Sequence, residues 1–86
     1  MGSKIEKAKK RLKSLPTDYR YSEAKNLLIS LGYYEYNKGK TSGSRVLFVK
    51  KADAHKIMLH KPHPKDEMPL YAVRQLVENL ENRGEL

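Results

Sequence analysis

The residues best suited to chemistry gather in two short stretches, of which the first is a turn-like segment over residues 38–45. It reads Lys38-Gly39-Lys40-Thr41-Ser42-Gly43-Ser44-Arg45. Glycines let backbone N–H groups approach a phosphate closely, and Lys and Arg supply the opposing positive charge. The pattern predicts a phosphate-binding turn in which Lys38, Lys40 and Ser44 contact RNA, although an ordinary surface turn has the same composition.

The second stretch holds two imidazoles. His60 ends a β-prone segment, and His63 follows between two prolines in Lys61-Pro62-His63-Pro64. An imidazole beside a phosphodiester can take the proton of a ribose 2′-OH while Arg45 stabilises charge on the phosphate oxygens, which is RNA cleavage without a metal. We therefore expect His60 and Arg45 as catalytic residues, with Lys61 and His63 as RNA contacts. A structural hydrogen bond is the alternative role for either histidine.

Motifs for other chemistries are missing from the sequence. The chain has no Cys, and its three His lack the spacing and the neighbouring carboxylates of a metal site. It has no Walker loop, no GxGxxG motif and no Ser-nucleophile elbow. We therefore expect neither a cofactor nor a metal. The lack of Cys is compatible with a reducing cytoplasm.

Positive charge is concentrated in the first three quarters of the chain. The formal net charge is +8, and residues 1–65 hold sixteen Lys and Arg against five Asp and Glu, whereas residues 66–86 hold two against five. A basic body of this kind indicates RNA as a partner, and the alternative is a charge that only keeps the protein in solution. No apolar run approaches the roughly 20 residues that span a bilayer. We expect a cytoplasmic protein without membrane contact.

Apolar periodicity predicts two amphipathic helices and a basic one before them. The first amphipathic helix spans 22–31, with Ser22 as its N-cap and Gly32 as its stop, and the second starts at Pro69 and has Gly84 as its stop. Apolar residues recur at i, i+3, i+4 and i+7 in both. They are Ala24, Leu27, Leu28 and Leu31 in the first, and Val73, Leu76, Val77 and Leu80 in the second. The basic helix, residues 3–15, has a narrow apolar stripe, so we expect it to pack lightly or to order on a partner.

Three β-prone segments, residues 33–37, 45–50 and 56–60, lie between these helices. Their connections are short and favour an antiparallel meander. In a meander Arg45 begins the second strand and His60 ends the third, which puts both at the same end of the sheet. The three tyrosines of the first strand could pack in the core or stack on bases, and they are interpreted as packing residues.

Together these elements predict an α+β fold of order α-β-β-β-α. Its three-stranded antiparallel sheet carries both main helices on one face, as in double-stranded-RNA-binding-domain-like (dsRBD-like) folds, and an extra helix precedes it. We expect a single domain over 1–86, made of a basic helix over 1–16 and a main body over 20–84. The other face of the sheet stays open to a ligand or a partner.

Several short motifs resemble the HicA family of toxin–antitoxin proteins over roughly residues 20–84. They are Leu31-Gly32-Tyr33, Gly43-Ser44-Arg45, Val46-Leu47-Phe48 and Leu59-His60, followed by the closing amphipathic helix. The resemblance implies a dsRBD-like fold and a ribosome-independent, metal-independent ribonuclease that cuts mRNA. It also implies neutralisation by a HicB-like antitoxin that usually covers the active site.

One position departs from the family pattern. The turn motif in the family is usually Gly-Ser-His, and that His is catalytic, whereas this chain has Arg45 there. Arginine is always protonated and is no general base at neutral pH. Three interpretations follow: another base such as His60 acts, the protein binds RNA without cutting it, or the substitution inactivates it. The leading hypothesis is an mRNA-cleaving toxin, and the alternatives are a non-catalytic RNA-binding module and a protein-interaction subunit.

Overall fold

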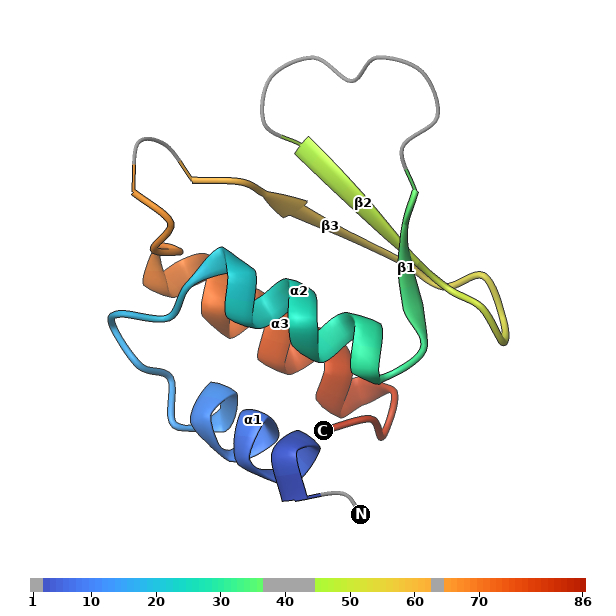
Figure 1. Ribbon diagram of the computed structural model, residues 1–86, viewed down its shortest axis with the longest axis horizontal. Coiled ribbons are helices and arrows are strands. Elements are labelled where there is room, and N and C mark those ends of the chain that lie inside the picture. The colour runs from blue at the N-terminus through green and yellow to red at the C-terminus, as the bar shows by residue number, and fades with distance from the viewer. Residues whose placement is uncertain (1–2, 37–44, 63–64) are drawn as a thin grey trace.

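A computed structural model describes residues 3–36, 45–62 and 65–86 (Figure 1). Its elements are α1 (Ser3–Lys13), α2 (Tyr21–Ser30), β1 (Tyr33–Tyr36), β2 (Arg45–Lys50), β3 (Lys56–His60) and α3 (Leu70–Asn82). The strands form an antiparallel meander in the order β1-β2-β3. The predicted α+β fold is confirmed: a dsRBD-like α-β-β-β-α body with an additional helix before it.

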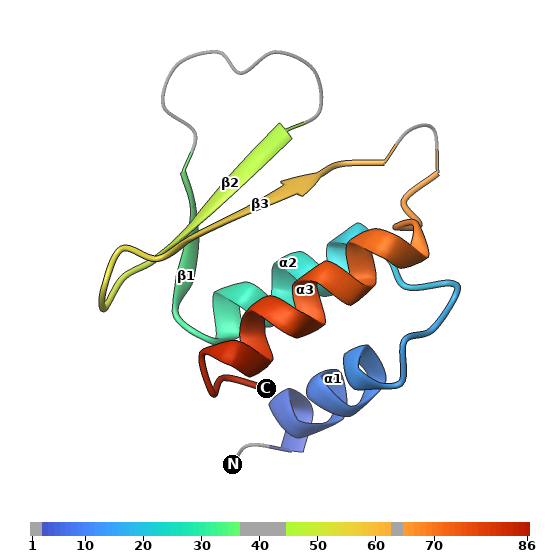
Figure 2. The ribbon, with the colours of Figure 1, turned by 180° about the vertical axis from the view of Figure 1, so that it is seen from behind.

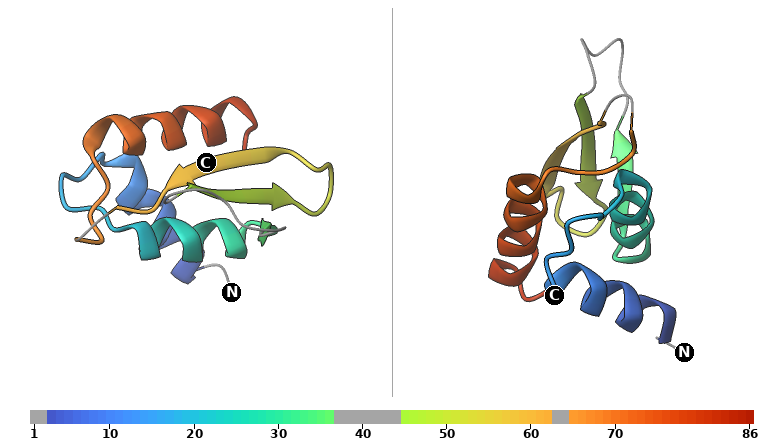
Figure 3. Two further views of the ribbon diagram at one scale, coloured as in Figure 1. Left: turned by 90° about the horizontal axis from the view of Figure 1, so that it is seen from above. Right: turned by 90° about the vertical axis from the view of Figure 1, so that its left-hand side faces the viewer.

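Helices α2 and α3 run side by side in the same direction against one face of the sheet (Figures 1 and 2). Figure 3 shows the sheet on one side of these two helices and α1 on the other. The core between these layers is apolar. Its buried residues are Leu12, Tyr19, Tyr21, Ala24, Leu27, Leu28, Tyr33, Phe48, Ile57, Leu59, Met68, Val73, Leu76 and Leu80.

Helix α1 is more than a lightly packed appendage, and that expectation was wrong. Leu12 is fully buried in the core. Arg11 forms ion pairs with Glu23 at the start of α2 and, at 3.2 Å, with Asp18. The hydrogen bond from Arg11 lowers the pKa of Glu23. A narrow apolar stripe thus suffices, because Leu12 in the core, Ala8 packed against it and the ion pairs of Arg11 attach the helix to the rest of the fold.

The start of α2 differs from the prediction. The helix begins at Tyr21, so Ser22 lies inside it and is not the N-cap. The carboxylate of Glu23 instead accepts a hydrogen bond from the backbone N–H of Arg20 at 3.0 Å. The backbone N–H of Tyr21 donates to the carbonyl of Asp66 at 2.7 Å, which ties the start of α2 to the segment before α3. This long-range contact sets the first residue of α2. Capping patterns describe only neighbouring residues, so they do not contain it.

The predicted stops are confirmed. Gly32 follows α2 with φ +99°, and Gly84 follows α3 with φ +72°. A positive φ costs glycine little and strains other residues, which is why helices commonly end there. Gly32 turns the chain from α2 directly into β1, and Gly84 returns the C-terminal residues toward the sheet.

Candidate functional site

Strand register places Arg45 directly opposite His60. Arg45 is the first residue of β2 and His60 is the last residue of β3, and the two are paired across the antiparallel ladder. Directly opposite residues project on the same face, with Cβ atoms about 4.5–5.5 Å apart. The prediction that the meander brings these two side chains to one end of the sheet is confirmed.

Alternation along the strands shows which face carries the pair. Phe48, Ile57 and Leu59 are buried against the helices. Residues one position away point to the opposite, open face. The strand residues on that open face are Tyr34, Tyr36, Arg45, Leu47, Val49, Lys56, Met58 and His60. Both predicted catalytic residues therefore lie on the face that the described helices leave uncovered.

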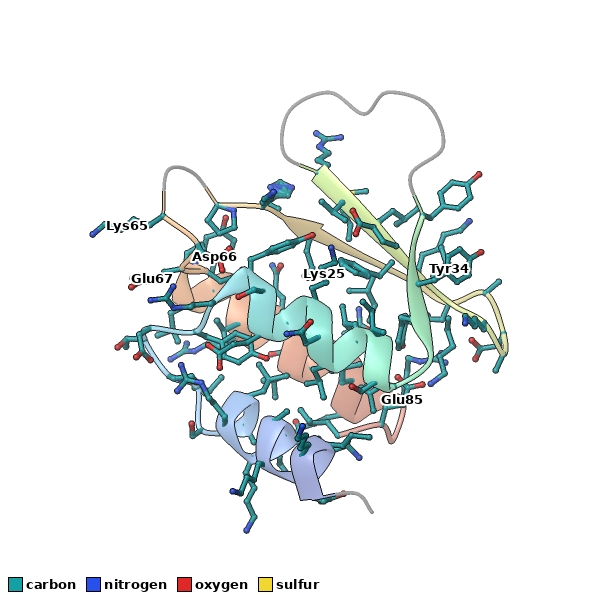
Figure 4. All side chains as sticks on the ribbon, viewed as in Figure 1. Lys25, Tyr34, Lys65, Asp66, Glu67 and Glu85 are labelled. Carbon is teal, nitrogen blue, oxygen red and sulfur yellow. The ribbon has the colours of Figure 1, made fainter. Side chains whose placement is uncertain are left out.

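The open face is aromatic, apolar and cationic. The three strands contain a single carboxylate, Glu35, which lies on the helix side and pairs with Lys25 of α2 at 3.1 Å. Tyr34 and Tyr36 are 40% and 39% exposed, so the interpretation as packing residues was wrong for these two. Figure 4 shows Tyr34 projecting away from α2. An exposed surface with rings and cations but no strand carboxylate suits a polyanion with stacking bases.

The other predicted RNA contacts are only partly covered by the structure. Lys38, Lys40, Ser44 and His63 lie outside the described residues. Lys61 is exposed and directly follows β3, next to His60. The structure thus brings together Arg45, His60 and Lys61 at one end of the sheet.

The opposite end of the sheet holds an ion-pair network that the sequence reasoning missed. Glu85 accepts a hydrogen bond from the Tyr33 hydroxyl at 2.7 Å and lies 3.1 Å from the Lys50 ammonium. Arg83 bridges Glu85 at 3.2 Å and Asp53 at 2.6 Å. The position of Glu85 directly after the predicted stop glycine was the one available signal, because that glycine turns the chain back toward the sheet.

Burial and these hydrogen bonds shift two pKa values in the network. Burial alone would raise the pKa of Glu85, but hydrogen bonds from Tyr33, Lys50 and Arg83 outweigh it and lower this pKa. Burial, helped by the bond to Glu85, raises the pKa of Tyr33 to about 12. Glu85 is therefore a carboxylate held in its charged form by three donors, which is a structural role.

His55 is half-buried at this same end. Its Nε2 lies 2.9 Å from Oδ1 of Asn79 on α3, and its ring meets the ring of Tyr33 edge-on. The two described ends of the sheet thus each have a histidine, with different surroundings.

Neither a metal cluster nor a membrane span is found in the described part of the chain. No group of three or more His, Asp or Glu there is arranged to hold a metal ion. No helix among the same residues has the length and apolar character needed to cross a bilayer.

Comparison with known proteins supplies a family. Comparisons with curated proteins and with solved structures give no significant match. The family model described as the HicA toxin of bacterial toxin–antitoxin systems matches residues 21–81. The matched range holds α2, the whole sheet and nearly all of α3, and leaves α1 outside. Because the match covers well over half of the chain, this protein belongs to the HicA toxin family, whose toxins have an antitoxin partner.

Proposed function

We propose that this toxin binds mRNA on the open face of the sheet and cleaves it there, in the cytoplasm and without a metal, with Arg45 and His60 as catalytic residues. The observation that carries the proposal is the pairing of Arg45 with His60 across β2 and β3 on that face. Family membership as a toxin supports an activity that harms the cell, and the cationic, aromatic surface supports RNA as its target.

The proposed step is an internal attack within the RNA. The His60 imidazole takes the proton of a ribose 2′-OH, and the 2′ oxygen forms a bond to the adjacent phosphorus. The bond from phosphorus to the 5′ oxygen breaks, and that oxygen takes a proton from solvent. Arg45 stabilises the negative charge that develops on the non-bridging oxygens. The products are a 2′,3′-cyclic phosphate and a 5′-hydroxyl end.

Register also supplies a reason why an arginine can occupy the position of the usual family histidine. The side chain directly across the ladder from that position is an imidazole, and it lies on the same face. An imidazole on β3 can reach the phosphate that a cation on β2 holds, since neighbouring strands lie about 4.7–4.9 Å apart. The base is thus moved by one strand rather than lost.

The direct test incubates purified protein with single-stranded RNA in EDTA and looks for 2′,3′-cyclic phosphate ends. We expect cleavage by the wild type, and a loss of about 10²–10⁴-fold in rate for His60→Gln. His55→Gln is the matched control, because His55 is the other histidine among the described residues and lies at the far end of the sheet, and once folded it should lose far less activity than His60→Gln. Intact RNA, or a His60→Gln variant as active as wild type, would refute the catalytic assignment.

A second candidate function is RNA binding without cleavage, which the arginine at position 45 favours. It predicts salt-dependent RNA binding and intact RNA. The Arg45→His variant separates the two functions, because it restores the histidine of the family motif. If the wild type is inactive and Arg45→His cuts RNA, the protein is a binder that lost its base. If both cut and His60→Gln does not, the base is His60.

A further inference from the structure

A groove lies beside His60, between β3 and α3, the two elements that face the viewer in Figure 2. It encloses about 240 Å³. A cavity of roughly 150 Å³ is enough for benzene, so the groove has room for a planar ring system. Six of the residues that line it carry the argument: Met58, His60, Tyr71, Gln75, Leu76 and Asn79.

The spacing of α3 aims three side chains at this groove. Tyr71, Gln75 and Asn79 recur every four residues, so they lie in one row along the helix. Tyr71 is 64% exposed, so its ring can stack on a planar partner, while the Gln75 and Asn79 amides carry both donors and acceptors. Oδ1 of Asn79 lies 2.9 Å from Nε2 of His55, which fixes this amide in place.

The chemistry of the lining matches a nucleobase. A base needs a flat apolar surface for its faces and paired donors and acceptors for its edge. Leu76 is 2% exposed and forms part of the apolar wall, next to the two amides. None of the described residues that line the groove carries a carboxylate, so nothing in the lining repels the phosphates on either side of a bound base.

We propose that this groove is a base-binding subsite that seats one nucleobase of the RNA next to the cleaved phosphate. The proposal rests on the proposed function, because the groove reaches His60 and a base held there belongs to a nucleotide whose backbone crosses the Arg45 and His60 pair. Tyr71 stacks on the base, and Gln75 and Asn79 read its edge. The subsite therefore makes cleavage depend on the identity of one nucleotide.

Cleavage-site mapping on a pool of random RNA tests the subsite. We expect wild type to prefer one base at a fixed position next to the cut, and Tyr71→Ala and Gln75→Ala to reduce that preference about tenfold. Tyr71→Phe keeps the ring and should keep the preference. Asn82→Ala removes an exposed amide from the same helix outside the groove and should change nothing. An unchanged cleavage pattern in both groove variants would overturn the proposal and leave the proposed function standing.

Binding to the four homopolymeric oligonucleotides separates the subsite from catalysis. If the wild type binds one of them preferentially and Tyr71→Ala removes that preference, the subsite stands even for a protein that does not cut RNA. Equal binding of all four by the wild type overturns it. If the groove variants instead lose binding to the cognate antitoxin while cleavage sites stay the same, the groove seats a protein, and the nucleobase proposal is wrong.

Discussion

The two ends of β2 pair similar residues and use them differently. At one end Arg45 lies across from His60, and at the other the backbone N–H of Lys50 donates to the carbonyl of His55 at 2.8 Å. The two cations are five residues apart, an odd number, so the alternation of a strand sends them to opposite faces. Lys50 points to the helix side and joins Glu85, whereas Arg45 points to the open face.

A cation in the sequence is therefore not always a cation that a polyanion can reach. The Lys50 ammonium lies 5.1 Å from the centre of the Tyr33 ring, donates to the carbonyl of Leu31 at 2.6 Å and pairs with Glu85. It therefore stabilises the fold by holding the end of α2, the start of β1 and the C-terminal residues together. The partner for this internal cation is Glu85, which comes from the acidic last segment of the chain, residues 66–86.

Replacing Arg45 or Lys50 by alanine is expected to give the largest effects, and these effects should differ between the two ends of the sheet. Arg45→Ala should lower the cleavage rate about 10²–10³-fold, because a donor to the developing phosphate charge is lost. Lys50→Ala should lower the free energy of unfolding by about 1.5–3 kcal/mol, because a charged hydrogen-bond donor to Glu85 is lost. Cleavage rate per folded molecule and urea unfolding together measure both effects.

The comparison requires that the two variants differ in activity per folded molecule. Lys50→Ala should cut RNA at the wild-type rate per folded molecule, whereas Arg45→Ala should lose activity even when the loss is corrected for any unfolded protein. Arg45→Lys keeps the charge but not the planar fork, and should recover part of the rate. Equal activity losses in Lys50→Ala and Arg45→Ala would show that the two ends do not divide their roles.

Neutralising Glu85 probes the structural end through pH. The pKa of Glu85 is lowered in the folded protein, so its contribution to stability is present above the unfolded pKa, near 4.5, and is lost as pH falls through the folded pKa. Glu85→Gln should lower the free energy of unfolding at pH 7 by about 1.5–3 kcal/mol. It should also flatten the loss of stability below about pH 5. A variant whose stability falls with acid as steeply as that of wild type would contradict this role.

Sequence periodicity predicted the fold well because each element carries its own local signal. Helix faces repeat every three or four residues, and glycines mark both stops, so α2, α3 and the meander followed from short stretches. The placement of Arg45 and His60 at one end of the sheet followed too, because an antiparallel meander brings the start of one strand beside the end of the next. Their direct pairing across the ladder is a finding of the structure. The Glu85 network did not follow from the sequence, since the pairs Tyr33–Glu85, Lys50–Glu85 and Asp53–Arg83 are 52, 35 and 30 residues apart and meet only in the folded chain.

The exposure of Tyr34 and Tyr36 was missed for a related reason. Three aromatic residues in four positions suggest packing, but a strand with one covered face can bury only every second side chain. Only the position of the helices decides which set is covered, and Tyr33 is the tyrosine that faces them. With the covered face known, Tyr33 would have been assigned to the core and Tyr34 and Tyr36 to the exposed surface.

Removing one hydroxyl gives a smaller test of the same network. Tyr33→Phe keeps the buried ring and loses the 2.7 Å bond to Glu85, so we expect a loss of about 0.5–1.5 kcal/mol in unfolding free energy. Because the pKa of Tyr33 is raised to about 12, its contribution is full below the unfolded pKa of about 10 and is lost as pH rises toward 12. The variant should lack this alkaline loss, and its RNA cleavage should be unchanged.

The smallest expected effect is a difference between the two ends of the sheet in the salt dependence of RNA affinity. Lys61 is exposed beside His60, so Lys61→Gln should remove about one phosphate contact and reduce the slope of log affinity against log salt by about 0.7 for single-stranded RNA. Affinity at 50 mM salt should then fall only a few-fold. Lys51→Gln, an exposed lysine at the Lys50 end, is the matched control and should leave the slope unchanged. If both variants changed the slope equally, RNA would be attracted by the total charge of the protein rather than held at the Arg45 end. The two ends of the sheet would then differ only in what they contribute to stability.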